Sequence, residues 1–377
     1  MRKAKDWSQP CPNPACTHYR LMNRGNVRAI STYQTQSGQR RIFHCKLCDE
    51  QFSETRQTVF FDLRTTEEKV IVVLKLLLCK VELTSISFAL GMTEETILEW
   101  LRRAAEKAAE INQHLLREVR VTQVQLDELW AFILRKHAQE AAEDGESTDE
   151  STDGRQWVWV SFAPEFRLLP ATYVGPRTFR SALRLIQMTA AVVCGVPCFF
   201  SDGFSSYLPA LIAVYHQIRE FARTGKRGRP RNPVVEPHPE LVYAQLVKQK
   251  KQGRLKSLAE RICCGAARLA ALGLKISTSL IERFNLTLRH ALAPLTRKCL
   301  GFCKDREQLR RRVTFFQAFY NFGRPHQSLR RSLPASEEPE VGLFQRKWQP
   351  RTPGMAAGLT DHIWTFRELL TAKFEPI

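Results

Sequence analysis

Three acidic residues that are far apart in the sequence, Asp127, Asp202 and Glu282, occur in local patterns that could assemble a catalytic metal site. Carboxylates are hard oxygen ligands that suit Mg²⁺ or Mn²⁺, which bind through a few carboxylates together with water and substrate phosphate. Two such ions can clamp one phosphodiester, because one activates the attacking oxygen and the other stabilises the leaving oxygen. The chain has 38 Asp and Glu residues, so the choice of these three depends on the elements that carry them.

The first acid is predicted to lie on a β-strand. The stretch VTQVQLDELWAFI, which begins at Val121, alternates apolar and polar residues and contains Asp127. The neighbouring Glu128 should face the opposite side of that strand and is therefore not expected to join the site. Residues 156–162 and 167–174 have the same strand character, so the three segments together predict an antiparallel meander.

The second acid follows a short apolar run. Residues 180–194 are predicted to be helical, and the next segment, VPCFFSDGFSSY, becomes polar at Asp202 and Gly203. This pattern is typical of a buried central strand whose acid emerges at the carboxyl end. In open α/β sheets, ligands bind in the crevice at that end.

The third acid lies on a predicted amphipathic helix, TSLIERFNLTLRH, from Thr278 to His290. At 100° per residue, Glu282, Asn285 and Arg289 share the face opposite to the apolar stripe. An acid on such a face is ordinarily a solvated residue, and a basic residue there is ordinarily a solvated charge. A catalytic interpretation therefore needs support from the rest of the chain.

Four cysteines form a second candidate metal site, with the spacing Cys11-x4-Cys16 and Cys45-x2-Cys48. Two such pairs suit one tetrahedral Zn²⁺ bound by four thiolates. The segment between the pairs is predicted to form two strands around a turn at Ser37, which is how a zinc ribbon is built. His18 and His44 are close enough in the sequence to replace one cysteine. The total of eleven cysteines is odd, which disfavours a disulfide framework and favours a reducing compartment.

Residues 83–104, LTSISFALGMTEETILEWLRRA, predict a helix, a tight turn and a second helix. Gly91 suits the left-handed turn position, and Thr93 suits the N-cap of the second helix. The pattern resembles a DNA-binding helix-turn-helix, although an ordinary helical hairpin has the same features and Glu94 and Glu95 would repel phosphates. The exposed residues predicted to contact DNA are Thr96, Arg102 and Arg103.

The composition favours a globular protein with a polyanionic partner. The chain has 377 residues, enough for two or three domains, and a formal net charge of +19. Nucleic acid is favoured over a membrane, because the longest apolar run, which begins at Val70, is interrupted by Lys75 and falls well short of the roughly 20 residues needed to span a bilayer. No signal-peptide pattern is seen at the start, so a cytoplasmic location is expected.

Two strongly charged segments interrupt the predicted sheet. Residues 138–154 are acidic and lack aromatic residues, as in a solvated loop. Residues 215–274 are basic and are predicted to be an insertion into the core domain. Within this insertion Arg227 and Arg231 flank a Gly228-Arg229-Pro230 core. The segment resembles an AT-hook, whose arginines suit a narrow minor groove; a solvated basic loop is the alternative.

The segments LDELW, SDGFSSY and TSLIERFNLTLRHALAPLTRK resemble the catalytic blocks of DDE transposases of the bacterial insertion sequence family numbered one. The amino-terminal ribbon and helix-turn-helix are similar to the DNA-binding half of that family. The resemblance implies an RNase H-like catalytic domain in which Asp127, Asp202 and Glu282 hold two Mg²⁺ or Mn²⁺ ions. It also implies that Arg289 contacts DNA, whereas Asn285 could contact DNA or a metal-bound water.

The expected architecture is therefore α/β, with a zinc ribbon at 1–62, an all-α helix-turn-helix domain at 63–120, an RNase H-like domain at 121–330 and a tail at 331–377. The expected function is that of a transposase, which binds the terminal inverted repeats of its element and cleaves and joins DNA strands. Because two DNA ends must be paired, a homodimer or higher oligomer is expected. The alternatives are a non-catalytic DNA-binding regulator derived from a transposase and an RNase H-like structure-specific nuclease. A bacterial or archaeal, nucleoid-associated location follows from the resemblance.

Overall fold

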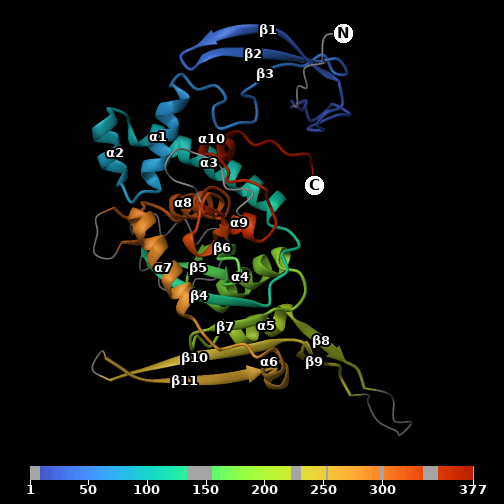
Figure 1. Ribbon diagram of the computed structural model, residues 1–377, viewed down its shortest axis with the longest axis vertical. Helices are drawn as coiled ribbons and strands as arrows, with labels where there is room; N and C mark the ends of the chain where they lie inside the picture. Colours follow the sequence, from blue (N-terminus) through green and yellow to red (C-terminus); the bar gives the residue numbers. More distant parts are fainter. Residues whose placement is uncertain are drawn as a thin grey trace.

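The computed structural model describes residues 9–133, 155–221, 231–251, 254–296, 301–333 and 347–376. The predicted acidic loop at 138–154, together with Arg227 and Arg229, lies outside the described residues. The described part is mixed α/β, with a six-stranded mixed sheet at its centre. A small β-sheet lies at one end of the molecule, several helices follow, and two β-hairpins extend from the opposite end (Figure 1).

The amino-terminal sheet consists of three antiparallel strands, β1 (Val27–Thr35), β2 (Gly38–Cys45) and β3 (Gln51–Ser53). The predicted turn before Gly38 is confirmed. Gly38 adopts a φ of +100°, which a residue with a Cβ rarely adopts. The hairpin returns the chain from the first cysteine pair to the second, so Cys45 lies at the end of β2.

Three helices follow: α1 (Glu67–Leu77), α2 (Leu83–Leu90) and α3 (Glu94–Leu115). Gly91 ends α2 with a φ of +58°, and the Thr93 side chain accepts a hydrogen bond from the backbone N–H of Thr96 at the start of α3. The predicted helix, turn and helix are confirmed as local structure. Ile97, Trp100 and Leu101 are buried, as the periodicity of the sequence indicates.

The central sheet has the strand order β11-β10-β7-β4-β5-β6. The meander of β4, β5 and β6 is antiparallel, whereas β7 pairs in parallel with both β4 and β10, and β11 returns antiparallel to β10. The predicted meander and the short apolar strand are confirmed. The strands are β4 (Gln123–Phe132), β5 (Arg155–Ala163), β6 (Leu168–Gly175), β7 (Cys198–Ser201), β10 (Val242–Lys251) and β11 (Arg254–Cys264).

The structure differs from the sequence prediction in the segment expected to be an insertion, 215–274. Residues Val242 to Gln245 of β10 pair with Cys198 to Ser201 of β7, so β10 is an inner strand of the central sheet. The part that leaves the sheet is the separate hairpin of β8 (His216–Arg219) and β9 (Val234–Pro237). The helix α6 (Ala266–Leu272) also lies in this segment, whereas α4 (Phe179–Val192) and α5 (Tyr207–Val214) precede it.

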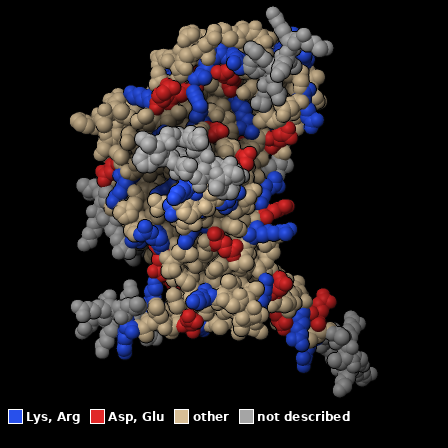
Figure 2. Space-filling view, in the orientation of Figure 1, with Lys and Arg blue, Asp and Glu red and all other residues tan. Residues whose placement is uncertain are grey.

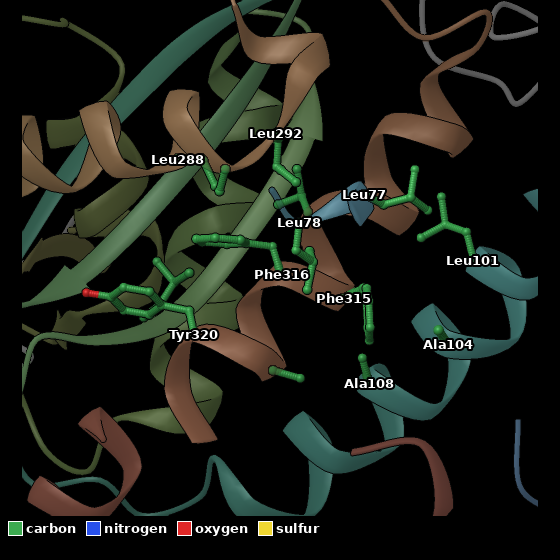
Figure 3. Close-up of a cluster of buried hydrophobic side chains, with 14 of the residues drawn as sticks. Leu77, Leu78, Leu101, Ala104, Ala108, Leu288, Leu292, Phe315, Phe316 and Tyr320 are labelled. Atoms are coloured by element: carbon green, nitrogen blue, oxygen red, sulfur yellow. The ribbon is translucent and has the colours of Figure 1, made fainter. Parts of the chain in front are cut away.

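One hydrophobic core joins the amino-terminal helices to the sheet through α7 (Ser279–Ala291) and α8 (Arg306–Ala318). Figure 3 shows Phe315 and Phe316 of α8 between Leu101 of α3 and Leu288 of α7. Burial of such large apolar side chains contributes about 1.5–3 kcal/mol each. The helix that carries Glu282 is therefore anchored from the side opposite to the acid.

The carboxyl-terminal residues return to the first half of the chain. The backbone N–H of Val59 donates to the carbonyl oxygen of Leu370 at 3.0 Å, and Lys373 donates to Gln9. Residues 347–376 thus pack against the ribbon and helices, although the sequence analysis assigned them to a tail. The elements of this region are β12 (Arg331–Ser332), β13 (Trp348–Gln349), α9 (Pro353–Ala356) and α10 (Phe366–Thr371).

Positive and negative side chains are mixed on one face of the molecule (Figure 2). On the face shown in Figure 2, Lys and Arg side chains are spread along the length of the molecule and are interspersed with Asp and Glu. Within the described ranges, no helix combines the length and the apolar character needed to cross a membrane.

Candidate active site and metal centre

The three predicted acids line one cavity of about 910 Å³. Asp127 comes from β4, Asp202 directly follows β7, and Glu282 lies in the first turn of α7. β4 and β7 are parallel neighbours in which Leu126 pairs with Ser201, so Asp127, in the middle of β4, lies beside Asp202 at the carboxyl end of β7. The other residues that line the cavity are Arg177, Gly203, Phe204, Ser205, Leu246, Val247 and Lys248.

A buried amide fixes the helix that carries the third acid. Gln125 of β4 accepts a hydrogen bond at 2.9 Å from the backbone N–H of Ile281, which directly precedes Glu282. This N–H belongs to the first turn of a helix, where backbone donors have no partner within the helix. The contact therefore fastens the first turn of α7 to the strand that carries Asp127.

Asp127 is the most constrained of the three acids. Its Oδ2 accepts a hydrogen bond at 2.6 Å from the Asn285 side chain, and its Oδ1 accepts one at 2.9 Å from the backbone N–H of Glu128. Burial raises the pKa of Asp127 to about 7, and the negative charges of Glu128 and Asp202 add to this increase, with a further contribution from Glu282. The carboxylates are close enough to repel one another, which is the condition under which a divalent cation stabilises a site.

The other two acids also have partners in the protein. The backbone N–H of Phe204 donates to Oδ1 of Asp202 at 3.0 Å. Glu282 accepts a hydrogen bond at 2.7 Å from the hydroxyl of Thr278 and forms an ion pair with Lys248 of β10. Each of the three acids thus has hydrogen-bond donors within the protein and also lines the cavity.

The donor set fits magnesium or manganese. Three carboxylates supply hard oxygen ligands, and Mg²⁺ needs only one or two of them directly because it keeps several waters. Among the described residues, the oxygen atoms of these acids do not form a compact set of three within 4.8 Å of one another. The site is therefore open, with space in the cavity for water and phosphate oxygens.

Glu128 is a residue that the sequence analysis set aside. Its side chain is buried, as expected for the other side of β4, but its oxygen atoms bind a residue of the cavity. Nε and Nη2 of Arg177 donate to Oε1 at 2.9 and 2.6 Å, and the hydroxyl of Tyr207 donates to Oε2 at 2.8 Å. The strand pattern correctly indicates the direction of Glu128, but it gives no information on the loop that brings Arg177 to it.

The four predicted cysteines form a compact cluster in which all Sγ atoms lie within 4.8 Å of one another. The Sγ atoms of Cys11 and Cys48 are 3.6 Å apart, and those of Cys16 and Cys45 are 3.8 Å apart. A tetrahedral Zn²⁺ with Zn–S bonds of about 2.3 Å separates its sulfur ligands by about 3.8 Å, so the cluster is compatible with a structural metal site. Asn26 donates to Cys45 Sγ at 3.2 Å.

The histidines near this cluster are not part of it. Among the described residues, the compact group comprises the four cysteines alone. Nε2 of His44 is paired with Asp49 at 3.0 Å. The structure therefore supports a set of four sulfur ligands. Neither His18 nor His44 replaces a cysteine in this group.

The residues predicted to contact DNA from α3 are occupied by contacts within the protein. Arg102 donates to Glu99 and Glu106, and Arg103 donates to Glu99 and to the carbonyl oxygen of Phe61. The side chain of Thr96 is hydrogen-bonded to the N-cap residue. DNA contact by these three residues stays a prediction, and for the two arginines it would have to compete with ion pairs.

The other predicted DNA contacts have different surroundings. Asn285 lies inside the candidate active site, bound to Asp127. Arg289 is partly buried in the last turn of α7, on the face of Glu282 and Asn285. Arg231 is exposed near the β8–β9 hairpin, 5.6 Å from the centre of the Phe221 ring. A role in DNA binding stays a prediction for all of them.

Comparison with models of known protein families and with curated proteins gives no match. The class that the fold and site define is a mixed α/β protein with a four-cysteine cluster compatible with a structural metal. The feature of the structure that bears on function beyond that class is the geometry of the carboxylate cavity.

Proposed function

We propose that this protein is a DDE transposase that binds the terminal inverted repeats of an insertion sequence and catalyses metal-dependent cleavage and transfer of DNA strands. The observation that carries the proposal is the convergence of Asp127, Asp202 and Glu282, from three separate elements, on one cavity. Three acids chosen at random from 38 would rarely line the same cavity. The mixed sheet, with an antiparallel meander and parallel strands beyond it, supports an RNase H-like catalytic domain.

The residues of the cavity have distinct tasks in this proposal. Asp127, Asp202 and Glu282 would hold two Mg²⁺ or Mn²⁺ ions, which supply an activated attacking oxygen and stabilise the leaving oxygen of an in-line displacement. Asn285 fixes the orientation of the Asp127 carboxylate by donating to Oδ2. Thr278 does the same for Glu282.

The amino-terminal part is proposed to recognise DNA. The four-cysteine cluster supports one structural Zn²⁺ in a ribbon at 1–62, and the geometry of α2, Gly91 and α3 supports a helix-turn-helix domain at 63–120. The net charge of +19 supports double-stranded DNA, as element ends and target, as the partner. A homodimer or higher oligomer on DNA and a cytoplasmic, nucleoid-associated location belong to the same proposal.

The test is incubation of the purified protein with Mg²⁺ or Mn²⁺ and labelled DNA that carries the sequences flanking its gene. Wild-type protein and Glu282→Gln are compared, with Glu220→Gln as a control that removes the same charge from an exposed site outside the cavity. We expect wild type and the control to cleave and join the ends, whereas Glu282→Gln binds them equally well without cleaving.

The other outcomes separate the alternatives. Binding without cleavage by wild type, in both metals, would identify a DNA-binding regulator and overturn the enzymatic proposal. Cleavage of branched DNA, without preference for the element ends and without joining, would identify a structure-specific nuclease instead. Cleavage by Glu282→Gln at the wild-type rate would remove Glu282 from the site.

A further inference from the structure

We infer that Arg177 binds a DNA phosphate in the carboxylate cavity and that the buried Glu128 holds Arg177 in the orientation for doing so. This inference rests on the proposed function, because it assigns a phosphate-binding residue to the same site. The resemblance of the catalytic blocks does not include Arg177, which lies in the loop between β6 and α4. Three features of the surroundings of Arg177 support this inference.

The first feature is the anchoring of one edge of the guanidinium. Nε and Nη2 of Arg177 both donate to Oε1 of Glu128, and Tyr207 donates to Oε2. Tyr207 is fully buried, and the Glu128 side chain is only 2% exposed. Both oxygens of Glu128 are therefore satisfied, and the carboxylate has no freedom to move towards the cavity.

The second feature is the packing of the guanidinium plane against aromatic rings. Cζ of Arg177 lies 4.3 Å from the ring centre of Phe204 and 5.1 Å from that of Trp157. An arginine stacked on aromatic faces loses little further freedom when it binds a planar or tetrahedral anion. Phe204 is also the residue whose backbone N–H binds Asp202, so the arginine and this acid are held by one short loop.

The third feature is the free edge of the same group. The Arg177 side chain is 41% exposed and lines the cavity that contains the three acids. The structure gives Nη1 no hydrogen-bond partner among the described residues, since both bonds to Glu128 use the other two nitrogens. A guanidinium with one edge fixed and the other facing a cavity is suited to bind phosphate oxygens.

Glu128 also limits the competition between Arg177 and the metal ions for the acids of the cavity. A cation beside Asp127 and Asp202 would form an ion pair with them and would compete with the metal ions for their oxygens. Because Glu128 binds Nε and Nη2 of Arg177, these two nitrogens are not available to pair with Asp127 or Asp202. Glu128 is thus a positioning residue, and Arg177 is the residue that touches the substrate.

A purely structural ion pair is the competing explanation. Buried ion pairs often contribute little to stability, and removing one partner leaves an uncompensated charge. The test therefore needs a measurement that a structural role would not affect. The salt dependence of DNA binding is such a measurement, because each lost phosphate contact lowers the slope of log Kd against log salt concentration by about 0.9.

The experiment measures binding of a fluorescent duplex, carrying the sequences that flank the gene, over a series of salt concentrations in Ca²⁺, so that no cleavage is needed. Four proteins are compared: wild type, Arg177→Gln, the double variant Glu128→Gln with Arg177→Gln, and the control Arg184→Gln. Arg184 is exposed on α4 outside the cavity. The double variant leaves no unpaired buried charge, so it keeps the test valid if Arg177→Gln does not fold.

We expect the slope to fall by about 0.9 in both variants that lack Arg177 and to stay unchanged in Arg184→Gln. In a parallel cleavage assay, Glu128→Gln alone should raise the Mg²⁺ concentration required for half-maximal rate, and adding Arg177→Gln should restore it. A wild-type slope in the double variant would overturn the inference and leave the pair a structural one.

The outcome for the proposed function is separate. If wild type does not cleave DNA but the slope still changes with Arg177, the proposed function fails and the phosphate contact stands. If wild type cleaves and joins DNA while the double variant binds and cleaves like wild type, the transposase proposal stands and the role of Arg177 is excluded.

Discussion

The two candidate metal sites of this protein differ in how completely the protein assembles them. In the cysteine cluster, four sulfur atoms lie within 4.8 Å of one another. In the carboxylate cavity, three acids face a space of about 910 Å³ and do not form such a compact set. A closed, four-ligand set is typical of a structural metal, whereas an open set with room for water and substrate is typical of a catalytic one.

Both sites nevertheless share one structural feature, a side-chain amide that donates a hydrogen bond to a candidate ligand atom. Asn26 donates to Sγ of Cys45 at 3.2 Å, and Asn285 donates to Oδ2 of Asp127 at 2.6 Å. Such outer donors orient ligands and adjust their affinity for the metal. The difference between the sites therefore lies in the number and spacing of the ligands, and variants of matched residues can test it.

The largest effect is expected for Cys45→Ser. Loss of one of four thiolates should release the zinc, and structural zinc in small peptide sites contributes apparent binding free energies of about 10–16 kcal/mol. Metal analysis should find one zinc per chain in wild type and none in the variant, together with a lower melting temperature and weaker DNA binding. Cys194→Ser, at an exposed cysteine outside the cluster, is the control. Unchanged zinc content in Cys45→Ser would show that the cluster is not a zinc site.

The cysteine site could be predicted almost completely because its information is local. The two pairs are short motifs, and the hairpin between them has a glycine at the turn. The helices around Gly91 and the strands of the meander could also be predicted, because their apolar periodicity can be recognised within about ten residues. The strands β5 and β6 lie within one residue of their predicted bounds, whereas α3 continues to Leu115, beyond the stretch that predicted it.

The sequence could not indicate features that depend on pairing between distant segments. The strand β10 pairs in parallel with β7 across more than forty residues of chain, and its basic carboxyl half made it resemble part of an insertion. The contacts of Lys248 and Arg177 follow from that arrangement and from a loop, so neither residue was predicted as part of the site. Glu128 was set aside because the direction of its side chain is local information, whereas its partners are not.

The next effect is expected for Asn285→Ala in the carboxylate cavity. Without the amide, Asp127 loses the donor that fixes Oδ2, so the rate of strand cleavage should fall by about 10- to 100-fold. DNA binding should change little. The control is Gln187→Ala, which truncates an exposed amide on α4. Cleavage by Asn285→Ala at the wild-type rate would mean that other groups position Asp127. The amides of Asn285 and Asn26 would then not have equivalent roles in the two sites.

A smaller effect is expected for the matched variant Asn26→Ala. Four thiolates remain, so zinc should stay bound, but loss of one N–H donor to Cys45 should weaken the affinity by about tenfold, at the lower end of such effects. Competition with a chromophoric chelator measures this affinity. If Asn26→Ala lost zinc as completely as Cys45→Ser, the four thiolates would not be sufficient to hold the zinc without the Asn26 donor.

The smallest effect is expected for Lys248→Gln, which removes the lysine that is paired with Glu282 in the carboxylate cavity. Lys248 is paired with Glu282, and the two side chains are 35% and 42% exposed, so the pair contributes about 0.2–1 kcal/mol. A metal ion that uses Glu282 must displace the ammonium group. Lys248→Gln should therefore lower the Mg²⁺ concentration for half-maximal cleavage by up to about fivefold, since 1.4 kcal/mol corresponds to tenfold.

Titration of the cleavage rate with Mg²⁺ measures this change, with Lys256→Gln, an exposed lysine on β11, as the control. An increased Mg²⁺ requirement in Lys248→Gln would show that Lys248 assists the site rather than competes for it. The side-chain contacts of the clustered cysteines in the described part of the chain are with one another and with the uncharged Asn26. Removing a positive charge elsewhere on the ribbon should therefore leave the zinc affinity unchanged. Competition between a protein cation and a metal ion is thus expected only at the open site, where the ligands are not already committed to one another.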